Sequence, residues 1–324
     1  MKVIFLSSRS NQNGPKPVIM NQGGSIEALG VPIDYFPVLS NGPGGYIKTI
    51  RPLRKHIRKT RPDIIHAHYG LCGIIALLAR RKQKLVVSFM GDDIVGSNRK
   101  DGSVSRRSRL FGRLNTFLSR NYYDFSIVKS KEMLARGTFN ANVELIPNGV
   151  DLDIMHPGDR REARSRLNLD PERKIIVFMA DPGRAEKNYS LARQAVERLD
   201  DGDVDLQAVY NKPFSELVHY YNAADLLLVT SFHEGSPNII KEAMACNCPV
   251  VSTPVGDVEW VFGNTEGCYL ASYDPDDVAA KIRQALAFGS RTRGRERIME
   301  LGLNSVSVAE RIKGIYTQLL NSSN

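Results

Sequence analysis

The chain has 324 residues, more than a single hydrophobic core usually supports, so we expect two domains. Its hydrophobic content of 42% and charged content of 24% are ordinary for a globular protein, and no apolar run approaches the length of about 18 residues that a membrane-spanning helix needs. The 4 cysteines are too few for a disulfide framework, and Cys246 and Cys248 lack zinc-finger spacing, which indicates a cytoplasmic protein rather than a secreted one.

The net charge of +9 is unevenly distributed along the chain. Residues 1–150 carry 24 Lys and Arg against 9 Asp and Glu, a net of +15, whereas the remainder carries 20 against 26, a net of −6. The acidic second half and the absence of a recognisable reading motif disfavour nucleic acid as a partner. The basic first half favours an anionic partner, and we expect an acceptor or a membrane surface of that charge.

Short apolar runs alternate with helix-length segments such as residues 46–60 and 276–287. This alternation predicts an α/β fold with parallel sheets covered by helices on both faces. The predicted strands are residues 3–6, 64–68, 85–90, 125–128, 143–146, 175–179, 206–209, 226–229, 250–251 and 268–270.

The best domain boundary is the turn sequence Pro147-Asn148-Gly149. It predicts two doubly wound domains, residues 1–150 and 151–305, whose strand carboxyl ends face a shared cleft. A last helix is expected within residues 306–324 and is a candidate to pack back on the first domain.

Polar residues follow several predicted strands of the first domain. The loop Asn11–Pro17 is placed to bring Gly14 close to a bound phosphate, although it is not a GxGxxG motif. His66 and His68 share one face of a strand, but a metal pair lacks a third ligand. A buried, hydrogen-bonded His66 and a His68 that touches a substrate hydroxyl fit the pattern better.

The next strand ends in Met90-Gly-Asp-Asp93. Asp92 or Asp93 is available there to orient an acceptor, and the competing role for either is a helix cap.

Residues 99–120 combine arginines with apolar residues at roughly helical spacing: Leu110, Phe111, Leu114, Phe117 and Leu118. This pattern fits a helix that lies on an anionic membrane surface. It also fits an ordinary amphipathic helix with a solvated basic face, and the sequence leaves both open.

In the second domain, the turn after strand 175–179 contains Arg184 and Lys187 and leads to a helix starting near Asn188. Two cations at a strand's carboxyl end would stabilise charge on a departing diphosphate. The alternative is that both are solvated surface charges. The loop 253–257 adds Gly256, where either backbone approaches a ligand or the chain merely turns.

Residues 234–242, EGSPNIIKE, follow the predicted strand 226–229. Ser236 and Pro237 suggest an N-cap and a first helical residue, so Gly235–Asn238 would offer unpaired N–H groups to a phosphate. Glu242 then lies roughly 7.5 Å along the helix, because each residue adds about 1.5 Å.

Carboxylates repel phosphates but accept hydrogen bonds from hydroxyls, so a nucleotide sugar would fit between Glu234 and Glu242. The alternative is that Glu234 complements the helix dipole and that Glu242 faces solvent.

The segment HEGSPNIIKEAMACNCPVVSTPVGDVEWV, residues 233–261, resembles the Glu-x7-Glu segment of the family 4 retaining glycosyltransferases, group 1. PDIIHAHYG, MGDD, IPNGVD and ADLLLVTS agree with the same family in the same order along the chain. The resemblance implies two Rossmann-like domains in the GT-B arrangement, the first binding the acceptor and the second the nucleotide sugar.

The resemblance also implies residue roles. Glu234 would contact the donor sugar, Glu242 the nucleotide ribose, and Lys187 the phosphates. The family's phosphate-binding arginine would fall at Asp181 or Pro182, so Arg184 stands displaced from it. Met90 replaces a histidine that is common in the family, and the short first half suggests a reduced acceptor site.

The activity implied is transfer of a hexose from a nucleoside diphosphate sugar to a glycan or lipid-linked acceptor, with retention and without a metal or cofactor. Such an enzyme of polysaccharide or glycolipid assembly would work in the cytoplasm, at the inner face of the membrane. The alternatives are a sugar-nucleotide epimerase, a phosphorylase-like enzyme, and a non-enzymatic nucleotide-sugar or nucleic-acid binding module.

Overall fold

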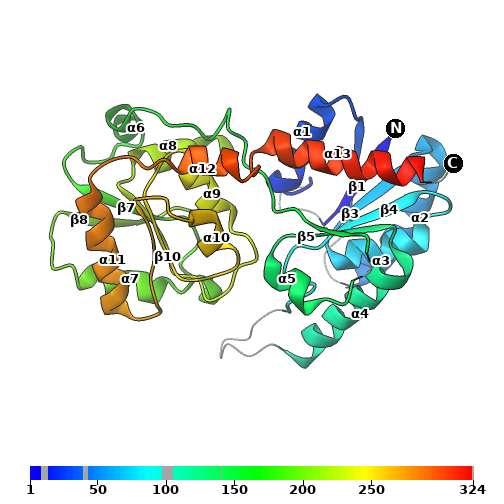
Figure 1. The fold of residues 1–324 in the computed structure, drawn as a ribbon, viewed down its shortest axis with the longest axis horizontal. Helices are drawn as coiled ribbons and strands as arrows, with labels where there is room; N and C mark the ends of the chain where they lie inside the picture. The colour runs from blue at the N-terminus through cyan, green and yellow to red at the C-terminus, as the bar shows by residue number, and fades with distance from the viewer. Residues whose placement is uncertain (9–13, 39–42, 97–104, 140, 323–324) are drawn as a thin grey trace. The chain divides into compact units, whose positions relative to one another are not determined.

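The computed structural model describes residues 1–8, 14–38, 43–96, 105–139 and 141–322 (Figure 1). The chain divides into two compact units, with crossings between Gly149 and Val150 and between Asn304 and Ser305. Of the described residues, unit 1 takes in those before the first crossing and those after the second, and unit 2 takes in residues 150–304. The predicted turn Pro147–Gly149 therefore lies at the first crossing.

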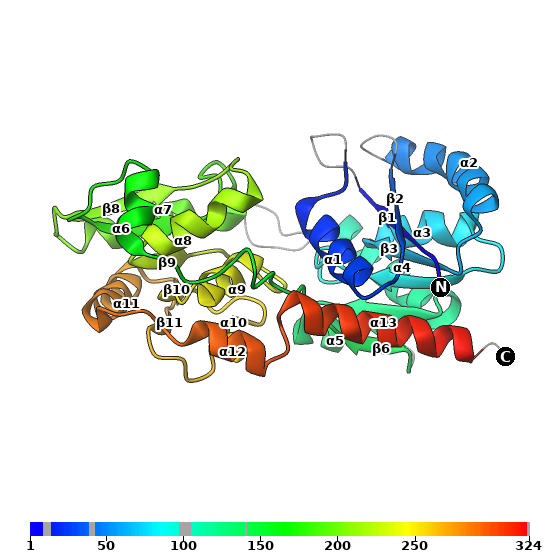
Figure 2. The same ribbon diagram turned by 90° about the horizontal axis from the view of Figure 1, so that it is seen from above.

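In the described residues, unit 1 is built on a six-stranded parallel sheet in the order β2-β1-β3-β4-β5-β6. Helices cover both faces of this sheet, which is why most of its strands are continuous apolar runs rather than alternating ones (Figure 2). Its elements are β1 (Val3–Ser7), α1 (Pro17–Ala28), β2 (Ile33–Pro37), α2 (Pro43–Thr60), β3 (Ile64–His68), α3 (Gly70–Ala79), β4 (Lys84–Ser88), α4 (Arg106–Tyr122), β5 (Phe125–Val128), α5 (Lys131–Arg136), β6 (Val143–Leu145) and α13 (Ser305–Asn321).

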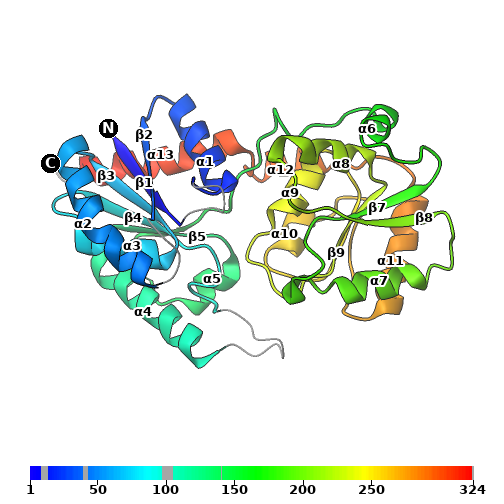
Figure 3. The same cartoon turned by 180° about the vertical axis from the view of Figure 1, so that it is seen from behind.

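Unit 2 is built on a five-stranded parallel sheet in the order β11-β10-β9-β7-β8, again counted within the described residues (Figure 3). An apolar core packs against each of the two faces of this sheet. Its elements are α6 (Arg160–Arg166), β7 (Lys174–Phe178), η1 (Ala185–Lys187), α7 (Tyr189–Glu197), β8 (Val204–Ala208), η2 (Phe214–Glu216), α8 (Leu217–Ala223), β9 (Leu226–Val229), α9 (Asn238–Ala245), β10 (Val250–Ser252), α10 (Val258–Phe262), β11 (Cys268–Leu270), α11 (Pro275–Phe288) and α12 (Gly294–Glu300).

The first three strands of each sheet are arranged in the same way. In each, the second strand lies on one side of the first and the third strand on the other, so the order reverses between β1 and β3 in unit 1 and between β7 and β9 in unit 2. Ligands of such sheets bind outside the strand carboxyl ends at this reversal. The topology therefore assigns one candidate binding edge to each unit.

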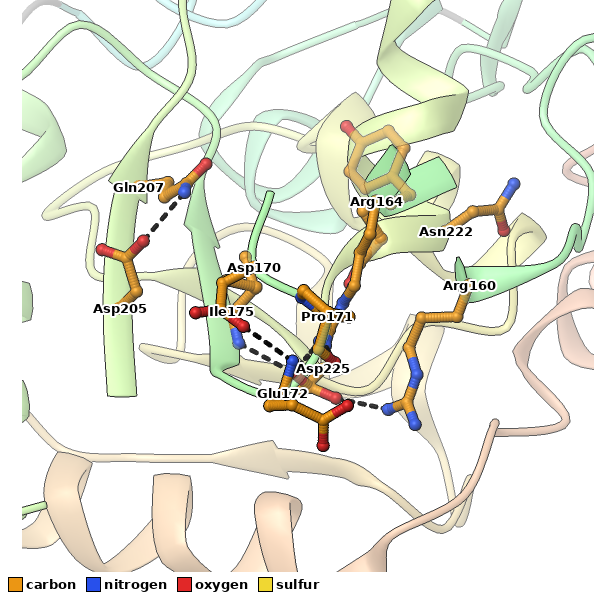
Figure 4. A network of polar contacts seen from close by, with 12 residues as sticks. Arg160, Arg164, Asp170, Pro171, Glu172, Ile175, Asp205, Gln207, Asn222 and Asp225 are labelled. Carbon is orange, nitrogen blue, oxygen red and sulfur yellow. Dashed lines mark hydrogen bonds and ion pairs between the residues drawn. The ribbon is translucent and has the colours of Figure 1, made fainter. Parts of the chain in front are cut away.

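A buried charge network joins β7 and β9 at the opposite, amino edge of the sheet (Figure 4). Asp225, just before β9, accepts from Arg160 Nη1 at 2.5 Å, from Arg164 Nη2 at 2.6 Å and from the backbone N–H of Ile175 at 2.7 Å. Arg164 is itself buried and donates to the carbonyl of Ala223 at 3.0 Å. The network fixes the relative positions of the two strands that carry the candidate site.

The last helix, α13, packs on unit 1 beside α1 (Figures 1 and 3). Tyr316 donates or accepts a hydrogen bond with His66 Nδ1, and Arg311 forms an ion pair with Glu144 at 2.7 Å. Residues distant in sequence thus complete one core.

The α/β fold class and all the predicted strands are confirmed, with ends shifted by a few residues. The sequence missed β2, because Asp34 and Pro37 interrupt its apolar run. The four cysteines are free thiols. Among the described helices, none has the length and hydropathy needed to span a membrane.

Candidate active site

The loop after β9 is fastened to the turn after β7 at the reversal point of unit 2. Thr230 Oγ1 donates to the carbonyls of Lys187 at 3.1 Å and Asn188 at 2.9 Å. The backbone N–H of Phe232 donates to the carbonyl of Glu186 at 2.9 Å. These bonds fix where the side chain of Lys187 can reach.

The loop after β10 supports the same region from its other side. Thr253 Oγ1 donates to the carbonyl of Ser231 at 2.8 Å. Gly256 has φ +57°, and a Cβ built there would lie 2.3 Å from the carbonyl oxygen of Gly235 and 2.9 Å from that of Glu234. Only glycine lets the two backbones approach so closely, so Gly256 positions the turn that carries Glu234.

Lys187 and Glu234 meet directly. The ammonium of Lys187 forms an ion pair with Glu234 Oε1, and Ser231 Oγ donates to the same oxygen at 3.0 Å. Both charged side chains are largely buried, with 15% and 17% of their surfaces exposed. The structure thus brings together two residues that the sequence placed at the ends of neighbouring strands.

Arg184 lies apart from this pair. Its guanidinium forms an ion pair with Glu186 at 2.5 Å and is more than half exposed. The displaced arginine therefore behaves here as the surface charge that the sequence kept as an alternative.

Glu242 is buried in α9, not solvent-facing. It is 8% exposed, and Tyr221 donates its hydroxyl to Glu242 Oε2 at 2.8 Å. Burial raises the pKa of Glu242, while the Tyr221 hydrogen bond and the charge of Lys241 oppose that shift. The alternative in which Glu242 faces solvent is wrong.

The start of α9 differs from the sequence-based expectation. The helix begins at Asn238 with Pro237 as its N-cap residue, so Ser236 is not the cap. Its hydroxyl instead accepts a hydrogen bond from Lys241 Nζ at 3.0 Å. Pro237 makes no side-chain cap hydrogen bond, so no cap side chain competes with an anion for the N–H groups of the first turn of α9.

Lys241 and Asp257 were missed by sequence reasoning. Both are buried near this turn, at 1% and 7% exposure. Burial lowers the pKa of Lys241 to about 8, and Asp257 and Glu242 counteract it. Burial also raises the pKa of Asp257, against the effect of Lys241. The signal in the sequence is the position of Lys241, one residue after Ile240, on the apolar face of a helix, where a lysine requires a nearby anion.

In unit 1, His68 and Asp93 are both corrected. His68 is 2% exposed, since it shares with His66 a strand face that is buried against Phe5. It therefore does not reach a substrate hydroxyl in this structure. His66 is buried and hydrogen-bonded, as predicted, to Ser88 Oγ at 2.8 Å.

The carboxylate of Asp93 binds backbone N–H groups and does not face an acceptor substrate. It is fully buried and accepts from the N–H groups of Gly70 and Met90, each at 2.9 Å, and of Gly91 at 3.0 Å. Tyr69 is the N-cap residue of α3, so Asp93 is not a helix cap of its own segment, but it accepts from the first N–H of α3 from a neighbouring turn. Burial raises its pKa to about 6. Asp92 is exposed and stays available at the same edge.

Gly14 is partly buried, and a Cβ built on it would meet no atom within 4 Å. Residues 11–13 of the predicted Asn11–Pro17 loop and residues 99–104 of the predicted 99–120 segment lie outside the described residues. In the part of the chain that is described, no group of three or more His, Cys, Asp and Glu side chains is arranged to hold a metal ion.

Comparison with known proteins gives two family matches, one in each unit. The model described as "Glycosyltransferase Family 4" matches residues 3–154, and the model described as "Glycosyl transferases group 1" matches residues 173–287.

Among curated proteins, the D-inositol 3-phosphate glycosyltransferase 2 of Catenulispora acidiphila is 26% identical over 301 residues, 77% of this chain and 67% of the relative. The D-inositol 3-phosphate glycosyltransferase of Mycobacterium marinum is 25% identical over 271 residues, 72% of this chain and 57% of the relative. The chain therefore spans only part of the length of such relatives.

Among solved structures, sucrose-phosphate synthase (tll1590) from Thermosynechococcus elongatus has a TM-score of 0.83 at 19% identity and covers 99% of this chain and 100% of its own. Alr3699/HepE of Anabaena, in complex with UDP and glucose, has a TM-score of 0.73 at 15% identity, covering 98% and 100%. This likeness shows the fold, two Rossmann-like α/β units of the GT-B type. The two family matches, over residues 3–154 and 173–287, show that the chain belongs to the family 4 glycosyltransferases, group 1.

Proposed function

We propose that the protein transfers a hexose from a nucleoside diphosphate sugar to a hydroxyl acceptor, with retention of anomeric configuration. The observation that carries the proposal is the pairing of Lys187 with Glu234 at the reversal point of unit 2, beside the first turn of α9. The ammonium and the unpaired N–H groups of α9 suit a diphosphate, and the carboxylate suits the hydroxyls of a sugar.

In this proposal, Glu242 binds the ribose of the nucleotide sugar. Tyr221 donates a hydrogen bond to one oxygen of its carboxylate. The other oxygen would accept from a ribose hydroxyl at the edge of the buried side chain. Lys241 would supply a further positive charge behind the phosphate turn.

The reaction would proceed at one face of the sugar. Retaining hydrolases place two carboxylates about 5 to 5.5 Å apart, one of them as nucleophile. Here the close partner of Glu234 is the ammonium of Lys187 rather than a second carboxylate. This favours direct transfer of the sugar to the acceptor, without a covalent intermediate on the enzyme. The bond between the anomeric carbon and the phosphate oxygen breaks, the acceptor oxygen bonds to that carbon on the same face, and its proton passes to the leaving diphosphate.

Lys187 would move from Glu234 toward the diphosphate as the donor binds, and its charge, with that of the α9 amides, would stabilise the leaving group. In this proposal no metal or cofactor is needed, because these groups supply the charge stabilisation. Asp92, at the binding edge of unit 1, would orient the acceptor.

Because the structure of Alr3699/HepE contains UDP and glucose, UDP is the first nucleotide to test. The acceptor would be an anionic or lipid-linked glycan at the cytoplasmic face of a membrane, in cell-surface glycan assembly. The basic first half supports this charge, and the curated relatives are named for a phosphorylated polyol.

The first experiment is a thermal-shift panel of UDP, GDP, ADP and NAD on the wild type and Glu242→Gln, with the exposed Glu266→Gln as matched control. A ligand at 100 times its Kd adds about 2.7 kcal/mol, which should raise the midpoint by several degrees. We expect one nucleoside diphosphate to stabilise the wild type and the control but not Glu242→Gln. Stabilisation by NAD alone would overturn the proposed site.

Turnover separates an enzyme from a binding module. With a panel of sugar nucleotides and acceptors, release of the nucleoside diphosphate should fall at least a hundredfold in Lys187→Ala and Glu234→Gln, since a single preorganised charge contributes about that factor. Tight donor binding without any release or transfer would exclude the transferase. Release without a glycosylated product would mean that water is the acceptor, and conversion of one sugar nucleotide into another without release would favour an epimerase.

A further inference from the structure

Helix α4 (Arg106–Tyr122) packs on unit 1 through its small and polar residues. Asn115 Nδ2 donates to the carbonyl of Asp93 at 2.8 Å, and Ser119 Oγ bonds to Ser126 Oγ at 2.6 Å. The buried residues of the helix are Gly112, Asn115, Thr116 and Ser119. A surface helix normally turns most of its apolar side chains to the core, and α4 departs from this pattern over part of its surface.

Three large apolar side chains of α4 face solvent, whereas Leu118 packs against the core of unit 1 and Phe111 contacts Tyr69. Leu110 is 68%, Leu114 44% and Phe117 55% exposed. Their spacing of four and then three residues sets them in one stripe, and at about 100° per residue this stripe lies roughly opposite Ser119. The exposed face of α4 is therefore apolar as well as basic, which the alternative of an ordinary amphipathic helix does not predict. We call Leu110, Leu114 and Phe117 the apolar stripe.

Arginines border the apolar stripe, and the helix contains no acidic residue. They are Arg106, Arg107, Arg109, Arg113 and Arg120. By helical geometry, Arg106 and Arg113 border one side of the stripe and Arg107 the other. Helix α2 of the same unit is also basic without an acid, and it exposes Ile47.

We propose that α4 is the surface through which the protein docks on an anionic membrane. Its apolar stripe would enter the boundary between headgroups and acyl chains, while the bordering arginines bind the anionic headgroups. The proposal deepens the proposed function, on which it rests for the nature of the acceptor, by naming the surface that brings the enzyme to it.

The chemistry of the helix argues for lipid over two other occupants. A second copy bound through the same patch would oppose its arginines with an identical set, at a cost in like-charge repulsion. Single-stranded nucleic acid is bound by basic grooves with aromatic side chains on which bases stack, whereas two of the three stripe residues are leucines.

The inner face of α4 links this surface to the candidate acceptor edge of unit 1. Asn115 binds the turn that contains Asp93, and Asp93 in turn holds the first N–H of α3 at Gly70. Exposed Asp92 lies in that same turn. A membrane-bound α4 would therefore keep the acceptor edge close to the lipid surface.

The test is cosedimentation with vesicles of phosphatidylcholine, with and without phosphatidylglycerol. One variant, Leu110→Ser with Phe117→Ser, removes the ends of the apolar stripe. A second replaces Arg106, Arg107 and Arg113 by Gln. The controls in unit 2 are the exposed Met299→Ser and the charge-matched replacement of Arg161, Arg166 and Arg193 by Gln.

We expect the wild type and both controls to bind only the anionic vesicles. The arginine variant should bind about a hundredfold more weakly, because each basic residue near an anionic surface contributes about 1 kcal/mol. The serine variant should lose at least tenfold, and the loss should persist at high salt, where screening removes the electrostatic part.

Wild-type affinity in the serine variant, or equal binding of the wild type to neutral vesicles, would overturn the proposal. So would a dimer of the wild type in sedimentation that the serine variant abolishes, since a second copy would then cover the stripe. Tighter binding to nucleic acid than to vesicles would do the same. Thermal shift by UDP, measured on every variant, shows whether the donor site is intact and so separates failure of docking from failure of the proposed function.

Discussion

Two histidines of β3 are held in surroundings that favour their neutral form. His66 and His68 are stacked with ring centroids 4.3 Å apart, and both are buried. Burial lowers the pKa of each, that of His68 to about 3, and the buried Lys129 lowers both further. Tyr316 and Ser88 bond to the ring nitrogens of His66. The pair is thus built for structure rather than proton transfer near neutral pH.

We expect the stability of unit 1 to fall as the pH drops below about 6.5. In the unfolded chain His68 takes up a proton below its ordinary pKa, whereas in the folded chain it stays neutral down to about 3, so the unfolded state binds more protons across that window. At pH 5 this costs about 2 kcal/mol for His68 alone. Urea unfolding near pH 7.5 and near pH 5 should show a smaller loss in His68→Leu than in the wild type.

The comparison with a variant is needed because Asp93 acts in the opposite direction. Burial raises its pKa to about 6, so its contribution to stability decreases as the pH rises from about 4 to about 6. Exposed His156→Gln is the control and should keep the wild-type slope. Equal acid losses in His68→Leu and the wild type would show that His68 is not the group responsible.

Residues whose role depends on chain position alone were predictable from the sequence. Glu234 and Lys187 follow strands that the topology makes neighbours, and a charge there is visible as a departure from the apolar run. The partner that a buried polar group selects was not predictable. The sequence suggested Ser236 as a helix cap, but its hydroxyl accepts a hydrogen bond from Lys241. It suggested Asp93 as a residue that orients an acceptor, but the Asp93 carboxylate accepts hydrogen bonds from three backbone N–H groups.

At the scale of elements, the close approach of two loops makes Gly256 a sensitive position. Gly256→Ala should weaken UDP binding at least tenfold in titration calorimetry, because its Cβ would lie 2.3 Å from the carbonyl oxygen of Gly235 and would displace the turn of Glu234. The positive φ adds about 1 to 2 kcal/mol of backbone strain.

Gly289→Ala is the matched control. Gly289 also has a positive φ, +66°, but its nearest neighbour for a Cβ is the carbonyl of Ala287 at an ordinary 3.6 Å. It should show the loss of stability without the loss of UDP affinity. Equal affinities in the two variants would mean that the contact between the loops does not position the donor site.

The charge network at the amino edge of the unit 2 sheet gives a prediction about stability. Asp225→Asn should lower the free energy of unfolding by about 3 to 5 kcal/mol, since it leaves the buried guanidinium of Arg164 without its anion. Asp201→Asn, which breaks the exposed pair with Lys174, should leave the thermal midpoint unchanged. Similar midpoints for both variants would show that the network contributes little.

The sequence predicted the elements whose residues are all buried to a similar extent. Strands buried on both faces are continuous apolar runs, and all those predicted are present. The edge strand β2 is only partly buried and tolerates Asp34 and Pro37, which hid it. The direction of α4 was also hidden, because helical spacing shows that apolar residues share a face but not which way that face points.

At the scale of the whole molecule, the sequence predicted the order of the two units along the chain and offered the return of the last helix to unit 1 as a candidate. Alternating strands and helices with one turn signal indicated two domains. The sequence offered the last helix only as a candidate to pack back on the first domain, because the spacing of residues 305–321 does not identify the core that they complete. The structure supplies that answer through apolar side chains of α13 that are buried in unit 1: Val308, Ala309, Ile312, Ile315, Tyr316 and Leu319.

Removal of α13 should therefore unfold unit 1 and spare unit 2. Burial of its five larger apolar side chains contributes about 10 kcal/mol at roughly 2 kcal/mol each, which is comparable to the whole stability of a domain. In a chain that ends at Asn304, the residues of unit 2 are all retained, so binding of the nucleoside diphosphate should persist there.

The chain offers a probe that separates the two units. Trp260 is the sole tryptophan in the sequence and lies in α10 of unit 2, so its fluorescence reports that unit, whereas far-UV circular dichroism reports both. Truncation after Asn304 should reduce the dichroism but leave the fluorescence transition and its shift by the nucleotide in place. A loss of both would mean that unit 2 depends on unit 1 for its fold, and an unchanged dichroism transition would mean that α13 is dispensable.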